Sequence, residues 1–171
     1  SVSDVRSGQA YPGVLLSFSM PRAVGHIPAY YNYKPTARRG YLFDDVSAAY
    51  HFGYGMSYTT FELSPPTLDV REIGVGETGR VTVTVTNTGE RTGSEVVQLY
   101  IRDKFSTFTR PVKELKGFEK VYLQPGESKE VSFSLGKEQL EYLGSGMKWV
   151  VAPGDFDIMV GYSSRGEDLK S

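Results

Sequence analysis

This 171-residue sequence contains three pairs of nearby carboxylates, a combination that can carry out acid/base or nucleophilic catalysis. They are Asp44 with Asp45, Glu138 with Glu141, and Asp155 with Asp157. Two acids about 5–10 Å apart can cleave a glycosidic bond when burial raises the pKa of one of them. The last two pairs are expected on a short helical face and on the polar face of a strand. Nothing there predicts desolvation, so we interpret them as solvated surface acids. Asp44 and Asp45 stay open as a candidate site, although adjacent residues rarely converge on one substrate atom.

Other chemical signatures are weak. The two histidines, His26 and His51, lie far apart without ligand-spaced neighbours, and the sequence has no cysteine, so we expect neither a metal site nor thiol chemistry. The G-x-S-x-G elbow of esterases is absent. Residues 74–79 spell G-x-G-x-x-G, but a strand is expected after them, whereas a dinucleotide site needs a helix there. We therefore expect no cofactor.

The overall composition argues against several classes of protein. The net charge is −1 and no basic cluster occurs, so there is no electrostatic reason to expect nucleic acid as a partner. No apolar run approaches the ~18 residues of a membrane span, so no membrane partner is expected. Hydrophobic content of 39% and aromatic content of 13% suffice for a core. The first residue is Ser1, which indicates a processed product or a fragment.

Residues from 67 onward show the alternation of apolar and polar side chains that is typical of strands. The alternating apolar residues are Val81, Val83 and Val85; Val97, Leu99 and Ile101; Val131, Phe133 and Leu135; and Phe156, Ile158 and Val160. The other expected elements are strands at residues 68–73, 114–123 and 148–152 and a short helix at residues 137–143. Proline–glycine pairs at residues 125–126 and 153–154 predict type II turns. Seven short strands in roughly 100 residues predict an all-β fold, a two-sheet sandwich of the immunoglobulin or fibronectin type III kind.

Residues 1–63 show neither a helical nor a strand period. They hold eight of the twelve tyrosines, and proline and glycine interrupt every candidate element, of which residues 14–18 are the best strand. Ordering such a segment costs ~1–2 kcal/mol per residue for the backbone, yet its aromatic content is unlike that of a disordered tail. We therefore expect it to pack on a partner surface, part of which lies outside this chain. The tyrosines could instead stack on sugar rings, but we favour interface packing.

Two stretches of the sequence carry long motifs. Residues 21–32 read PRAVGHIPAYYN, and residues 52–61 read FGYGMSYTTF. The motifs VTNTG, EVVQLY, RPVKELKGF and PGES then follow at residues 85–89, 95–100, 110–118 and 125–128. Taken in order, these motifs resemble PRxVGQIPxYYN, FGYGLSYTTF and the segments after them in the C-terminal region of glycoside hydrolase family 3 β-glucosidases, especially bacterial periplasmic ones. The resemblance covers about residues 15–163.

The resemblance implies a place at the end of an enzyme that has a barrel domain and then an α/β sandwich domain. Residues 1–63 would be the C-terminal end of the α/β domain plus a linker, residues 64–165 a fibronectin type III-like domain, and residues 166–171 a tail. The implied reaction is retaining hydrolysis of terminal β-D-glucosyl residues, with an Asp nucleophile in the barrel and a Glu acid/base in the α/β domain. Both lie upstream of the matched motifs, so no residue here is assigned a catalytic role and the substrate-binding residues stay unknown.

The implied partners are the upstream catalytic domains of the same enzyme and, through them, a β-glucoside, in the periplasm or in a secreted protein. Contacts at the domain junction are expected from Tyr30, Tyr31, Asn32, Phe52, Tyr54, Tyr58 and Phe61. The long connection from Asp103 to Arg110 is expected to border the mouth of the active site. Two alternatives remain: an independent carbohydrate-binding or adhesive β-sandwich module, and a self-contained hydrolase that uses Asp44 or Asp45.

Overall fold

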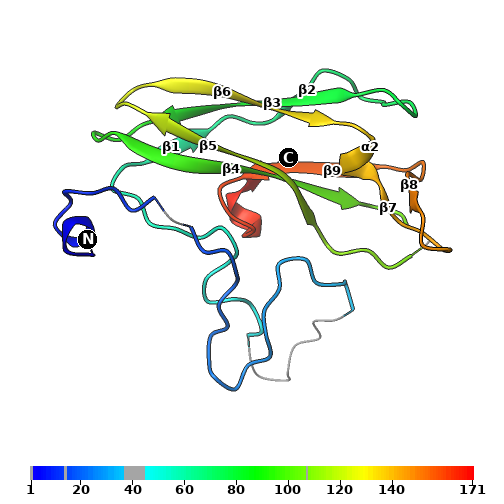
Figure 1. Ribbon diagram of the computed structural model, residues 1–171, viewed down its shortest axis with the longest axis horizontal. Helices are drawn as coiled ribbons and strands as arrows, with labels where there is room; N and C mark the ends of the chain where they lie inside the picture. The colour runs from blue at the N-terminus through cyan, green and yellow to red at the C-terminus, as the bar shows by residue number, and fades with distance from the viewer. Residues whose placement is uncertain (1, 14, 37–44, 107) are drawn as a thin grey trace.

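The computed structural model describes residues 2–13, 15–36, 45–106 and 108–171 and shows two β-sheets packed face to face (Figure 1). The first sheet contains β1 (Phe61–Leu63), β2 (Thr67–Leu68), β3 (Gly79–Asn87) and β6 (Ser128–Leu135). The second contains β4 (Gly93–Asp103), β5 (Glu114–Leu123), β9 (Phe156–Gly161) and β10 (Leu169–Lys170). A separate hairpin is formed by β7 (Tyr142–Leu143) and β8 (Trp149–Val150). The helices are α1 (Val2–Arg6), α2 (Lys137–Leu140) and the 3-10 turn η1 (Gly166–Asp168).

The strand order agrees with a sandwich built from antiparallel neighbours. In the first sheet β3 is central, because β6 pairs with it along one edge while β1 and β2 share the other. In the second sheet the order is β10-β9-β4-β5, and the β4–β5 register shifts between Leu99 and Tyr100. Within the described residues every strand pair is antiparallel. The predicted two-sheet, all-β sandwich is therefore confirmed.

The core lies between the two sheets and consists of the alternating apolar residues of their strands. Its buried members are Leu63, Val81, Val83, Val85, Val97, Leu99, Ile101, Val121, Leu123, Val131, Phe133, Leu135 and Val160. On β3 the intervening threonines are exposed or half-buried, as expected for a sheet with one solvated face. Branched aliphatic side chains suit this position because they pack well on a pleated surface.

Strand β4 departs from this pattern, because both of its faces are buried. Val97, Leu99 and Ile101 face the core, but the outward Ser94, Gln98 and Tyr100 are buried as well. The cover on the outer face comes from the N-terminal segment between residues 11 and 60, which we call the strap. Figure 1 shows the strap on the outer side of the second sheet, away from the first sheet. The second sheet is thus covered on both faces along β4, whereas Phe118 and Tyr122 of β5 remain exposed.

Several short elements differ in length from the sequence expectation. The strand expected at residues 68–73 is only the two-residue β2, and the one expected at 148–152 is β8, which pairs with β7 outside the two main sheets. The expected helix ends early because Tyr142 already enters β7. Residues 15–18 of the best N-terminal strand candidate are not in a strand, although Met20 forms a single bridge with Tyr50. Residues 166–171, expected to be a tail, extend the second sheet through β10.

Candidate docking surface

The strap is held to the second sheet by an aromatic cluster. The rings of Tyr31 and Phe52 lie 4.7 Å apart between centroids, and Tyr31 meets the buried ring of Tyr100 edge-on at 5.8 Å. Burial raises the pKa values of the Tyr31 and Tyr100 hydroxyls, so both rings remain neutral at physiological pH. Edge-on and tilted ring pairs are the favoured aromatic arrangements. This cluster therefore anchors two separate parts of the strap at one point of β4.

Backbone hydrogen bonds fix the strap at three further places. Within it, the Leu16 amide donates to the Tyr54 carbonyl at 2.9 Å, so two strap segments lie side by side. The Val112 amide donates to the Tyr33 carbonyl at 2.9 Å, and the Ser164 amide donates to the Phe52 carbonyl at 2.8 Å. These bonds satisfy backbone groups of a segment that has no regular secondary structure. The strap is thus ordered by the sandwich of its own chain.

A lysine that bonds to a backbone carbonyl supports the same region. The Lys113 ammonium donates to the Ser164 carbonyl at 2.5 Å, and burial lowers the pKa of this lysine. Since Ser164 also binds the strap through its amide, Lys113 stiffens the loop on which the strap rests.

Gly53 allows the closest approach between the strap and β4. Its φ of +83° lies in the left-handed region, and a Cβ built there would be 2.8 Å from the Gln98 Oε1. Gln98 is buried, accepts a hydrogen bond from the Tyr100 hydroxyl at 2.5 Å and donates to the Tyr162 carbonyl at 3.0 Å. Only glycine combines this backbone conformation with this lack of space. The FGYG motif therefore has a local structural reason for its first glycine.

We expect the substitution Gly53→Ala to loosen the strap from β4. The left-handed backbone and the displacement of Gln98 together cost about 2–3 kcal/mol. Limited trypsin digestion of the chain measures the effect, because cleavage after Arg22 reports opening of the strap. The rate should rise by at least about tenfold. Gly25→Ala is the matched control, since nothing lies within 4 Å of its Cβ position and no positive φ is found there. Equal cleavage of both variants would contradict the close approach.

Asn87 joins the end of the strap to both sheets. Its side chain is fully buried and accepts hydrogen bonds from the Thr59 hydroxyl at 2.7 Å and the Gly89 amide at 3.1 Å. Its amide group donates to the carbonyls of Arg91 at 2.8 Å and Leu123 at 3.0 Å. In the sequence this asparagine was noted only as part of the VTNTG motif. The motif carried a signal, because an asparagine shortly before a glycine often bonds to the backbone of its own loop.

The seven residues predicted to form domain contacts divide into two groups. Tyr31, Phe52 and Phe61 are half-buried against the sandwich, and Phe61 packs on its core. Tyr30, Asn32, Tyr54 and Tyr58 are exposed. The structure therefore brings the first group to the second sheet or the core of the chain itself and leaves the second group facing outward.

The outward side of the strap is rich in apolar surface. The exposed large apolar residues there are Phe18, Met20, Val24, Ile27, Tyr30, Tyr50, Tyr54, Met56 and Tyr58. The Tyr50 and Tyr54 rings lie 4.9 Å apart, and the Tyr58 hydroxyl donates to the Val5 carbonyl. A set of exposed aromatic and aliphatic side chains on an ordered segment is typical of a protein interface. We call this side the outer face of the strap.

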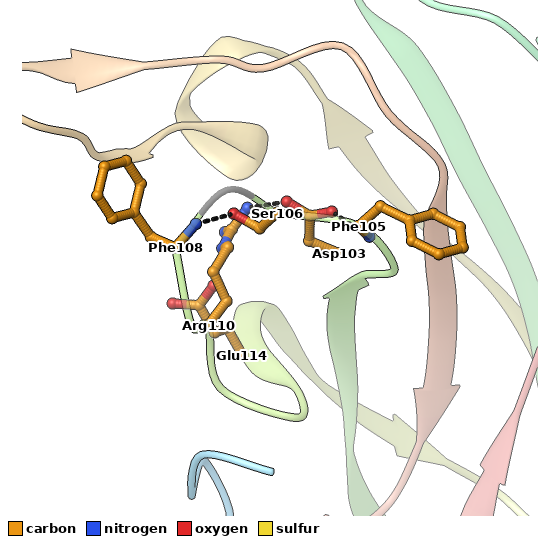
Figure 2. A network of polar contacts seen from close by, with 6 residues as sticks. All are labelled: Asp103, Phe105, Ser106, Phe108, Arg110 and Glu114. Carbon is orange, nitrogen blue, oxygen red and sulfur yellow. Dashed lines mark hydrogen bonds and ion pairs between the residues drawn. The ribbon is translucent and has the colours of Figure 1, made fainter. Parts of the chain in front are cut away.

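A second notable feature is an ion-pair network at the base of the connection between β4 and β5. Figure 2 shows the Arg110 guanidinium between two carboxylates: Nη1 lies 2.9 Å from Asp103 and Nη2 lies 2.8 Å from Glu114. The side chains of Arg110 and Asp103 are only 8% and 2% exposed. The guanidinium also lies 4.8 Å from the centre of the Tyr142 ring. The sequence predicted this connection as a contact with the active-site mouth but did not predict the ion-pair network. The only sign of the network in the sequence is one arginine between two acidic residues.

Within the described residues, the carboxylate pairs form no acid/base site. Asp44 lies outside the described residues. Asp45 is exposed, pairs with Arg22 at 2.9 Å, and hydrogen bonds from Ser47 lower its pKa. Asp157 pairs with Lys104 at 2.9 Å, and Glu138 is exposed on α2. A general acid needs the opposite shift, a raised pKa, so Asp45 does not fit that role.

Other places for a ligand are limited. Burial raises the pKa of Glu95, but the adjoining cavity, lined in part by Tyr11 and Met56, has a volume of about 10 Å³, which suits no more than one water molecule. A larger recess of about 410 Å³ lies beside β3, where Glu77 already accepts a hydrogen bond from the Gly74 amide at 2.9 Å. Among the described residues, no group of His, Cys, Asp and Glu side chains could hold a metal ion. In the same residues, no helix is long and apolar enough to cross a membrane.

Comparisons with known proteins identify the relatives of this chain. Residues 95–164 match the fibronectin type III-like domain family. A β-xylosidase of Formosa agariphila is 45% identical across 100% of this chain and 24% of its own length. A periplasmic β-glucosidase of Salmonella typhimurium is 41% identical across 96% of this chain and 23% of its own length. The chain therefore spans about a quarter of the length of these curated relatives and matches a C-terminal portion of them.

Solved structures agree with these relatives. A β-glucosidase from Erythrobacter marinus superposes with a TM-score of 0.93 at 42% identity and covers 99% of this chain, which corresponds to 22% of that protein. A β-glucosidase from Listeria innocua, solved with gluconolactone, gives a TM-score of 0.91 at 39% identity, with 99% of this chain and 25% of that protein covered. Because the match includes the strap as well as the sandwich, both parts keep this arrangement within longer polypeptides.

Proposed function

We propose that this chain is the C-terminal, non-catalytic structural portion of a retaining β-glucosidase of glycoside hydrolase family 3. The observation that carries the proposal is the two-sided strap, which has one side packed on the sandwich of its own chain and an apolar outer face exposed. A segment with two apolar sides is suited to lie between two domains. The alignment with a quarter of each β-glucosidase and β-xylosidase supports the rest of the same polypeptide as the partner of the outer face.

The domain boundaries follow from this arrangement. Residues 1–60 would be the end of an α/β domain plus a linker, and residues 61–165 the fibronectin type III-like domain, which begins with β1 rather than at residue 64 because β1 pairs with β3 and Leu63 lies in the core. The family match at residues 95–164 falls within the second range. The final residues 166–171 belong with this domain rather than with a tail, since β10 pairs with β9.

The chemistry would take place upstream of this chain. In retaining hydrolysis one carboxylate attacks the anomeric carbon and another acts first as acid and then as base. The described residues of this chain offer no such pair, so their contribution is to hold the catalytic portion in one conformation. Such support matters because small displacements of catalytic groups reduce rates strongly. One relative is named a periplasmic enzyme, and we propose the periplasm or secretion for this protein also.

We expect the 171-residue chain alone to show no turnover of aryl β-glucosides or aryl β-xylosides. The reason is that neither catalytic carboxylate is part of it. The assay compares the chain with the longer polypeptide that contains it, which should hydrolyse at least one of the two substrates. Turnover by the chain alone that disappears in Asp45→Asn, with Ser106→Ala as an active control, would overturn the proposal.

A further inference from the structure

The two ends of the connection between β4 and β5 are held together by an ion-pair network, which we call the base of the connection. Asp103 ends β4 and Glu114 begins β5, and Arg110 binds both carboxylates in the network described above. The Phe105 amide donates to Asp103 Oδ1 at 3.1 Å, so the same carboxylate also sets the direction in which the chain leaves β4. A largely desolvated ion pair of this kind holds one geometry well because leaving either charge unpaired is costly. The described residues next to this ion pair, Phe105 among them, are therefore presented in a defined orientation.

Two phenylalanines project from this base into solvent. Phe105 is 77% exposed and Phe108 is 48% exposed. Figure 2 shows their rings pointing away from each other on either side of the ion-pair network. A flexible loop could fold such rings against the sandwich, whereas this anchored one leaves them outside. Exposed aromatic rings on a well-ordered backbone segment are typical of residues that anchor an interface.

The two phenylalanines are connected to the strap. The Val112 amide, two residues after Arg110, donates to the Tyr33 carbonyl of the strap at 2.9 Å. Figure 1 shows the β4–β5 connection turning toward the side of the second sheet on which the strap lies. A body that covers the outer face of the strap would therefore also reach the neighbourhood of Phe105 and Phe108.

We propose that Phe105 and Phe108, whose rings point apart, each pack against an apolar part of the upstream portion of the same polypeptide, as a second contact beside the outer face of the strap. This inference rests on the proposed function, because the occupant is the part of the enzyme that precedes this chain. About three quarters of the length of each relative lies outside the match, which is enough to form such a surface. Two separate contacts fix the angle between two bodies more firmly than one contact does.

Thiol labelling tests the inference, since the chain has no cysteine of its own. The variants Phe105→Cys, Tyr54→Cys and Val75→Cys are each prepared in the chain alone and in the longer polypeptide. Labelling of the introduced cysteine by a maleimide is followed by peptide mass. The expected result is a labelling rate about tenfold or more lower for Phe105→Cys in the longer polypeptide. Val75 is the control, because it is 99% exposed in the turn before β3 and should label equally in both forms.

The outcomes separate the two proposals. Protection of Tyr54→Cys without protection of Phe105→Cys would overturn the second contact and leave the proposed function standing. Equal labelling of both in the two forms would contradict the proposed function itself. Protection of Phe105→Cys in the chain alone that grows with chain concentration would show a second copy as the occupant. Protection of the chain alone by a soluble β-glucan would show a sugar-binding surface, and either result would overturn the inference.

Discussion

Asn87→Ala should lower the free energy of unfolding of the chain by about 3–5 kcal/mol. The substitution removes four hydrogen bonds of a fully buried side chain. It leaves the Thr59 hydroxyl, the Gly89 amide and two carbonyl groups without their partner. Each buried polar group left unpaired costs about 1–3 kcal/mol, and relaxation or entry of a water molecule recovers part of the sum. Both sheets and the strap lose a common attachment, so we expect unfolding to remain a single transition.

Urea unfolding followed by tryptophan fluorescence measures this loss through the single residue Trp149 and is checked by circular dichroism. Thr88→Ala is the matched control, since Thr88 is the next residue and its hydroxyl bonds with Thr60 are exposed. It should cost at most about 0.5 kcal/mol. A loss below about 1 kcal/mol for Asn87→Ala would show that its bonds are readily replaced by water.

Asp103→Ala is expected to cost about 3–5 kcal/mol, because it leaves the Arg110 guanidinium buried with one of its two carboxylates missing. The Phe105 amide also loses its acceptor. We expect the β4–β5 connection to become mobile, so hydrogen exchange at residues 104–112 should rise more than in the core strands. Thermal unfolding gives the total loss.

Two further variants test whether the loss of stability in Asp103→Ala comes from the buried charge. Glu119→Ala breaks the Lys129–Glu119 pair at 3.0 Å, in which both side chains are substantially exposed, and should cost no more than about 1 kcal/mol. The double variant Asp103→Ala with Arg110→Met removes the buried charge as well and should be more stable than Asp103→Ala alone. A double variant that is less stable than the single one would mean that Arg110 contributes by packing on Tyr142 rather than by its charge.

The sandwich could be predicted from sequence because its information is local. The valines at positions 81, 83 and 85 alternate with threonines within one strand, and a period of two assigns a buried face without knowledge of any partner. Turn residues also act locally, but the two predicted type II turns differ in outcome: Gly126 has the required positive φ of +75°, whereas Gly154 does not, so the prediction at residues 153–154 is wrong. Short elements such as β2 and β8 were predicted too long, since two paired residues leave no period to measure.

The docking surface could be predicted only in part, because it depends on contacts between residues far apart in the sequence. Alternation suggested that Gln98 and Tyr100 face solvent, and only the strap packed above them explains why they are buried. The resemblance indicated Tyr31 and Phe52 as contact residues, but not that their partner is the sheet of their own chain. Nothing in the spacing of Asp103, Arg110 and Glu114 shows that they converge, since the bend of the connection places them together.

The attachment of Phe52 to Ser164 has a consequence for synthesis on the ribosome. The Phe52 carbonyl accepts a hydrogen bond from the Ser164 amide, but Phe52 leaves the ribosome more than a hundred residues before Ser164. At ~5–20 residues per second, the strap waits for several seconds or more while β9 and the loop after it are still being translated. A stall before Ser164 is translated would therefore yield a nascent chain whose strap lacks this attachment.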